Sequence, residues 1–74
     1  MDFRLKIFST AAQLQSFSKA GEVLYLSQPA VSFQIRSLEE ELGAKLFHRD
    51  RNKVILTEAG EALFLHAKEI FRIY

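Results

Sequence analysis

The segment from Ser27 to Phe33, with the sequence SQPAVSF, combines side chains that can contact the edges of DNA bases. Glutamine can bond an adenine edge through two atoms, serine can serve several bases, and an apolar side chain can touch the methyl group of thymine. At about 100° per residue, most of these side chains fall opposite or beside the apolar stripe of a helix. The residues of this helix expected to contact DNA are Ser27, Gln28, Pro29, Ala30, Ser32, Phe33 and Arg36. The alternative is an ordinary solvated helix face, and the outward phenylalanine argues against it.

A second set of candidate side chains is basic. Arg49, Arg51 and Lys53 alternate along the chain, so in an extended strand all three would lean to one side. We expect them to straddle a phosphate backbone or to enter a narrow minor groove. Charge clusters are common on loops, so ordinary surface charge is the competing interpretation.

Other side chains that could take part in catalysis or metal binding lack the further groups that such sites need. Glu39, Glu40 and Glu41 form an acidic run, but a catalytic carboxylate needs a shielded cleft and a second group, so a solvated helix face is expected. His48 and His66 lack the further spaced ligands of a metal site, and there is no cysteine. We therefore expect no enzyme, metal or cofactor.

Apolar spacing predicts the helices that would position the candidate residues. A first helix is predicted over 3–14, with Phe3, Ile7 and Leu14 on a face that would meet a neighbour. A short second helix near Ser18–Leu24 follows, with Ser16 and Ser18 as candidate N-caps.

The third helix has the clearest boundaries. Ser27 can cap it, Pro29 suits its first turn, and Gly43 can end it. The spacing of four, three and four residues predicts one buried stripe, formed by Val31, Ile35, Leu38 and Leu42.

Beyond Gly43, two short apolar stretches, 46–47 and 54–56, flank the polar run 48–53 and predict a small hairpin. Thr57 can cap a fourth helix, which continues in pattern to Tyr74. Its apolar residues cover several sides, more than one small core can use, so part of it should meet another chain. The residues expected at that interface are Phe3, Ile7, Leu63, Phe64, Ala67, Ile70, Phe71 and Tyr74.

The composition is compatible with these predictions but does not by itself indicate DNA binding. The 74 residues suffice for one small domain with a thin core, and the formal charge is only +1, so the arrangement of charge must carry any nucleic-acid argument. No apolar run approaches the length of about 20 residues that a membrane span needs, and no leader pattern is present, so a cytoplasmic protein is expected. Together, three helices with a tight turn before Ser27 and a basic hairpin predict a mainly α, winged helix-turn-helix fold.

The ordered motifs also resemble a known family, the N-terminal domain of LysR-type transcriptional regulators. The resemblance covers nearly the whole chain and is carried by five blocks. They are Phe17-Ser18-Lys19-Ala20-Gly21, Ser27-Gln28-Pro29-Ala30-Val31-Ser32, Leu38-Glu39-Glu40-Glu41-Leu42-Gly43, Leu46-Phe47-His48-Arg49 and Leu56-Thr57-Glu58-Ala59-Gly60, with Leu24, Gln34 and Ile35 matching between them.

The resemblance implies a homodimer joined through the fourth helix, which binds an interrupted palindrome in double-stranded DNA. It implies that Gln28, Pro29 and Ser32 contact base edges, that Ser18 contacts phosphate, and that Arg49 contacts the flanking backbone or minor groove. It also implies a winged helix-turn-helix domain over 1–57 and a truncated linker helix over 58–74, with a small-molecule effector acting only through a C-terminal domain missing from this sequence.

Two positions depart from the family pattern. Phe33 stands where a basic residue is usual, so an apolar contact would replace a polar one, and Gln15 stands where glycine is frequent.

A helical protein-interaction module that uses its apolar fourth helix is the alternative function.

Overall fold

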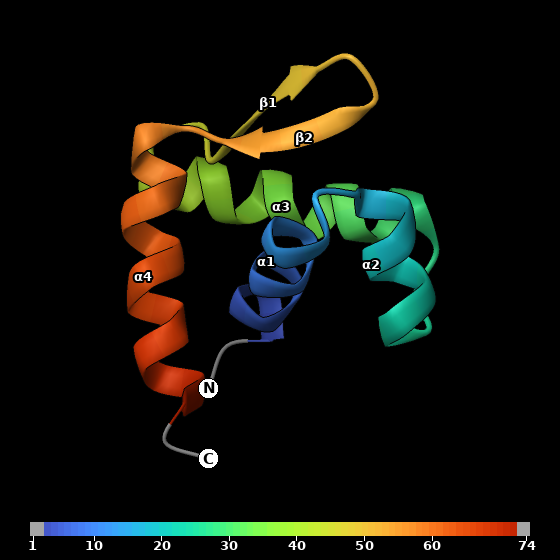
Figure 1. Cartoon of the computed structure of the whole chain (residues 1–74), viewed down its shortest axis with the longest axis horizontal. Helices are drawn as coiled ribbons and strands as arrows, with labels where there is room; N and C mark the ends of the chain where they lie inside the picture. The colour runs from blue at the N-terminus through green and yellow to red at the C-terminus, as the bar shows by residue number, and fades with distance from the viewer. Residues whose placement is uncertain (1–2, 73–74) are drawn as a thin grey trace.

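Helix α1, Phe3–Leu14, begins a bundle of three helices that forms most of the core. The computed structural model describes residues 3–72, and the side-chain environment of residues 3–70. Helix α2 covers Phe17–Leu24 and helix α3 covers Gln28–Leu42, and both pack on α1 (Figure 1). The expected order of helices and the tight turn before Ser27 are confirmed.

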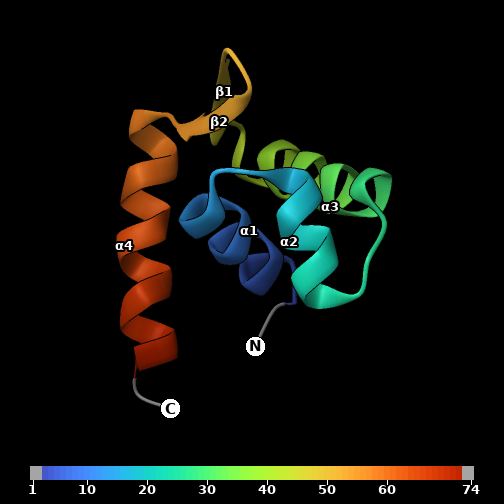
Figure 2. The ribbon, with the colours of Figure 1, turned by 45° about the vertical axis from the view of Figure 1, so that its right-hand side comes forward.

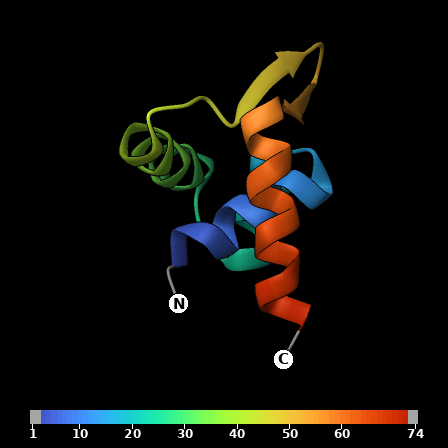
Figure 3. The ribbon, with the colours of Figure 1, turned by 90° about the vertical axis from the view of Figure 1, so that its left-hand side faces the viewer.

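The remaining chain forms a hairpin and one further helix. Strands β1, Phe47–Asp50, and β2, Lys53–Leu56, pair antiparallel, and α4 covers Glu58–Arg72. The hairpin rises above the bundle while α4 stands beside α1, with its opposite side turned away from the other helices (Figures 1 and 2). Seen from the side of α4, the hairpin extends beyond the helices (Figure 3). This is the expected winged helix-turn-helix arrangement with an added helix.

The core is built around phenylalanine rings from four elements. Phe8 of α1 is fully buried and packs against Phe47 of β1 at 5.3 Å between ring centroids and against Phe64 of α4 at 6.4 Å. Phe17 of α2 meets Phe47 edge to face at 5.2 Å. Such pairs add about 0.5–1.5 kcal/mol beyond area burial, so the rings tie the hairpin and α4 to the bundle.

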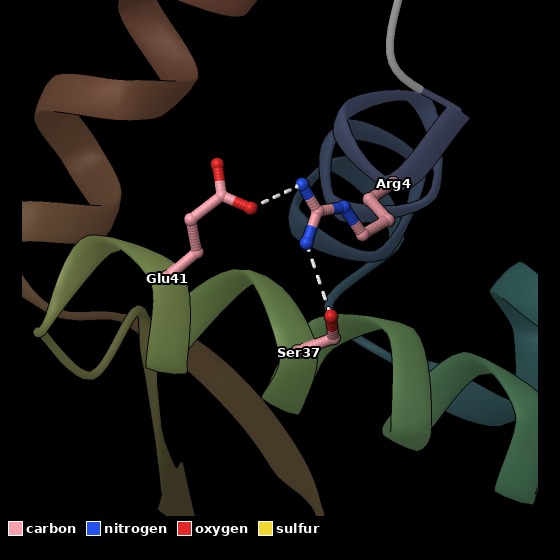
Figure 4. Close-up of polar contacts among 3 residues, drawn as sticks. All are labelled: Arg4, Ser37 and Glu41. Carbon is pink, nitrogen blue, oxygen red and sulfur yellow. Dashed lines mark hydrogen bonds and ion pairs between the residues drawn. The ribbon is translucent and has the colours of Figure 1, made fainter.

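Polar contacts hold the start of α1 against the end of α3. Arg4 donates from Nη1 to the Ser37 hydroxyl at 3.0 Å and pairs through Nη2 with the Glu41 carboxylate at 2.7 Å (Figure 4). The Glu41 side chain is 62% exposed, so water screens the pair and its contribution is small, about 0–1 kcal/mol. These contacts fix orientation more than they add stability.

Two details of the prediction were wrong. Leu42, expected in the buried stripe, is 49% exposed, because α3 continues a full turn past Leu38, the last residue of the stripe that the core covers. Ile7, expected to face a partner, is fully buried, because it is part of the core that α1 forms with the other elements. Of the two candidate caps of α2, Ser16 is confirmed: its hydroxyl accepts from the Lys19 amide, so the helix begins at Phe17, one residue before Ser18.

Candidate nucleic-acid interface

The turn between α2 and α3 sets the position of the exposed α3 helix. Tyr25 ends α2 in the left-handed conformation, with φ 60°, and the Leu26 amide bonds the Gly21 carbonyl at 2.8 Å. A Cβ at position 21 would lie 2.5 Å from the Leu26 carbonyl oxygen, so only glycine fits this approach. The close turn brings Ser27 to the start of α3, where its hydroxyl accepts from the Ala30 amide at 3.2 Å and caps the helix.

The first two turns of α3 present two parallel rows of side chains. In the polar row, Gln28 donates from Nε2 to the Ser32 hydroxyl at 2.8 Å, one helical turn along. In the apolar row, Pro29 and Phe33 are both exposed, Phe33 to 63%. Arg36 is exposed one turn beyond Ser32. The pattern predicted from 100° per residue is confirmed for this face, and it carries hydrogen-bonding, apolar and cationic groups together.

The hairpin places its cations differently from the prediction. Arg49 pairs with Val54 and Asp50 with Lys53, and cross-strand partners share a face while successive residues alternate. Arg49 therefore lies on the same face as buried Val54, and Lys53 lies on the opposite face. Arg51 is in the turn with φ 61° and follows neither strand. The expectation that all three cations lean to one side was wrong, because it assumed an extended chain through the turn.

A groove joins the exposed face of α3 to the hairpin. Ser32 and Arg36 line it from α3, and His48 and Arg49 line it from β1. Lys45, in the loop between these two elements, also lines it. The groove carries positive charge beside the two rows of α3, which is the complement of a phosphate backbone.

The hairpin is anchored by Glu39, a residue that the sequence analysis assigned to a solvated face. Its carboxylate accepts from the amide of buried Leu46 at 2.8 Å, and its side chain is 12% exposed. The signal that was missed is its position one residue beyond buried Leu38, at the edge of the buried stripe. Glu39 orients the loop that leads into β1.

Three further hydrogen bonds involve β2 or the residue that follows it. The Thr57 hydroxyl donates to the Lys45 carbonyl at 2.6 Å and accepts from the Gly60 amide at 3.0 Å, which confirms the predicted cap of α4. The Val54 amide donates to the Gln15 carbonyl at 3.4 Å. Gln15 has φ 54°, a conformation that favours glycine, which fits its place at a position where the resembled family frequently has glycine.

The structure separates the remaining candidates. Ser18 is exposed in the first turn of α2 and does not line the groove between α3 and the hairpin. Of the residues expected at a dimer interface, Phe3 is 56% exposed, whereas Ala67 is fully buried and, like Ile7, belongs to the interior of its own chain. Leu63, Phe64 and Ile70 are half-buried, and the side chains of Phe71 and Tyr74 lie outside the described residues.

Within residues 3–72, no three histidine, cysteine, aspartate or glutamate side chains gather so that they could hold a metal ion. Across the same described part of the chain, no helix combines the length and the apolar character that crossing a membrane requires.

The fold and the groove define the class, a winged helix-turn-helix domain with an added C-terminal helix. The family model described as "Bacterial regulatory helix-turn-helix protein, lysR family" matches residues 3–61. The chain therefore belongs to the LysR family of bacterial regulatory helix-turn-helix proteins, which confirms the expected membership.

Individual relatives agree with this assignment. The glycine cleavage system transcriptional activator of Escherichia coli (strain K12) is 51% identical over 67 residues, which are 90% of this chain and 22% of that protein. The chain thus spans about a fifth of the length of this relative.

Two solved structures are similar over nearly the whole chain. The CbnR_DBD-DNA complex matches with a TM-score of 0.88 and 34% identity, over 99% of this chain and 85% of that one. The BenM_DBD/benA site 1 DNA complex matches with a TM-score of 0.90 and 36% identity, over 97% of this chain and 82% of that one. Both are described by name as complexes with DNA.

Proposed function

We propose that this chain binds double-stranded DNA sequence-specifically, with α3 in the major groove and the hairpin at the flanking backbone or minor groove. The observation that carries the proposal is the groove in which Ser32 and Arg36 of α3 lie beside Arg49 of the hairpin. Base-reading groups and phosphate-binding groups are thus held in one rigid frame. The similarity to two domains named as DNA complexes supports the same proposal.

Roles divide according to chemistry. Gln28 and Ser32, which are half-buried, and the exposed apolar pair Pro29 and Phe33 contact base edges, because they form the two adjacent rows of α3. Arg36 and the hairpin cations contact phosphate, which carries no sequence information but sets register. Ser18 contacts a phosphate at the start of α2. Ser27 caps α3, and Ala30 donates its amide to that cap.

We further propose that the chain acts as a homodimer through α4 and binds an interrupted palindrome. The side of α4 that faces away from α1 has no neighbour among the described elements (Figure 2), and Leu65 on α4 is 65% exposed. Phe3 on α1 is also exposed, and Leu63 and Ile70, on a different side of α4 from Leu65, are half-buried. Sedimentation equilibrium tests this: Leu65→Lys lowers the dimer fraction, and an unchanged monomer–dimer equilibrium would contradict it.

The wider role of the protein is proposed on the same basis. Residues 1–57 form the DNA-binding domain and residues 58–74 begin a linker helix in a larger cytoplasmic transcription regulator, whose effector acts through a separate domain. The relative named above, a transcriptional activator, supports a regulatory rather than an enzymatic role.

Salt dependence tests DNA binding directly. The logarithm of affinity should fall with the logarithm of salt concentration by about 0.9 per phosphate neutralised. Arg49→Ala should reduce that slope by roughly one unit, while Lys6→Ala on α1, which removes a cation that does not line the groove, should leave it unchanged. A complex whose affinity ignores salt would refute the proposal.

A further inference from the structure

Phe33 is a large apolar side chain without a place in the core. It is 63% exposed, whereas Phe8, Phe17, Phe47 and Phe64 pack against one another. Because Phe33 takes no part in the ring contacts of the core, its exposed ring is available to a partner.

Phe33 is part of a continuous apolar ridge. Pro29 precedes it by one helical turn, roughly 6 Å along the axis, and is also exposed. Residues four apart lie above one another on the same side of a helix. We call the exposed surface of Pro29 and Phe33 the apolar ridge of α3. It runs beside the polar row, in which Gln28 is bonded to Ser32.

The surroundings of the ridge indicate a polyanionic partner. The adjoining groove is lined by Arg36, Lys45 and Arg49. Glu39 is the carboxylate among the described lining residues, and it already accepts from the Leu46 amide. A protein partner for the ridge would have to be acidic as well as apolar, whereas DNA supplies phosphates on both sides of a groove.

The major groove of DNA offers one kind of apolar group to such a ridge. Each base pair presents hydrogen-bond donors and acceptors in the major groove. The C5-methyl group of thymine is the apolar group among these polar atoms. A phenyl ring cannot satisfy a buried donor or acceptor, so placing it against a polar base edge would cost free energy, whereas a methyl group loses water favourably.

We propose that Phe33, supported by Pro29, contacts the C5-methyl group of one pyrimidine in each half-site. The methyl group itself is what Phe33 recognises, so 5-methylcytosine supplies the same contact as thymine. This inference rests on the proposed DNA binding and adds a chemical determinant to it. DNA methylation at that position then strengthens binding.

Removing or adding a single methyl group on the DNA tests the contact. The preferred half-site is first selected from a random duplex pool, and each thymine in it is then replaced singly by deoxyuridine, which removes the methyl group and keeps pairing. One position per half-site should weaken binding by about fourfold, the factor that corresponds to one buried methyl group. At the same position, a cytosine–guanine pair should bind about fourfold more tightly when the cytosine is 5-methylated.

Protein variants assign the effect to the ridge. Phe33→Ala should bind the thymine and deoxyuridine duplexes equally, and because the ring is exposed, its thermal midpoint should stay close to that of the original chain. Leu42→Ala, which removes an exposed apolar side chain from the other end of α3, should keep the full methyl dependence.

The outcomes separate the inference from the proposed function. Equal affinity for thymine and deoxyuridine at every position would overturn the methyl contact while leaving DNA binding intact. The methyl contact would also be overturned if Phe33→Ala kept the ratio of affinities between the thymine and deoxyuridine duplexes, even if it bound both duplexes more weakly than the original chain. Failure of the original chain to bind any duplex would refute the proposed function itself.

Discussion

Replacing Glu39 should loosen the hairpin even though the residue lies in a run of three glutamates. Its carboxylate accepts from the Leu46 amide at 2.8 Å, and Leu46 is 1% exposed. A hydrogen bond to a charged group contributes about 1.5–3 kcal/mol, and an unpaired buried amide costs a similar amount. The Lys45 ammonium adds little, because it is 4.0 Å away and 80% exposed. Glu39→Ala should therefore lower the free energy of unfolding by about 2 kcal/mol.

Thermal and urea unfolding followed by circular dichroism would measure this loss. For a domain of this size, about 2 kcal/mol corresponds to a fall in Tm of roughly 10 °C. Glu39→Gln keeps an acceptor oxygen and should lose only about half as much. Glu40→Ala is the matched control, because the next glutamate is exposed. If Glu39→Ala and Glu40→Ala changed stability equally, the assigned role of Glu39 would be wrong.

Two further predictions concern backbone conformation. Gln15→Gly should raise stability by about 0.5–1 kcal/mol in urea unfolding, because Gln15 has φ 54°, whereas Gln13→Gly inside α1 should lower it by a similar amount. A loss of stability in Gln15→Gly would contradict the left-handed conformation. Gly60→Ala should lower stability by about 1–3 kcal/mol despite the better helix propensity of alanine, because the added Cβ would meet the Leu46 carbonyl oxygen and lie 2.9 Å from Leu56 Cδ2. A more stable Gly60→Ala variant would refute that close approach.

Local signals in the sequence predicted most of α3 and the cap of α4. Ser27, Pro29 and Gly43 act within one turn of their own position, through capping bonds and backbone conformation, so no distant residue is needed to interpret them. The two rows of side chains on α3 follow from helix geometry in the same way. Phe33 was thus recognisable as an outward residue before its exposure was known.

The hairpin cations and the supporting residues depended on contacts between distant segments. Register set by the pairing of β1 with β2 put Arg49 and Lys53 on opposite faces, which alternation along one chain cannot reveal. Glu39 became a hairpin anchor only because Leu46 folds back over it.

The order of the elements, the start of α3 and the residues of its outward face could be predicted from the amino-acid sequence, because these follow from short-range geometry. Three features required the folded chain: Ile7 and Ala67 are core residues, Leu42 is exposed, and Arg49 is the hairpin cation beside α3. The physical reason is that burial and strand register depend on how separate segments pack, and periodicity along one segment shows a face without showing what covers it.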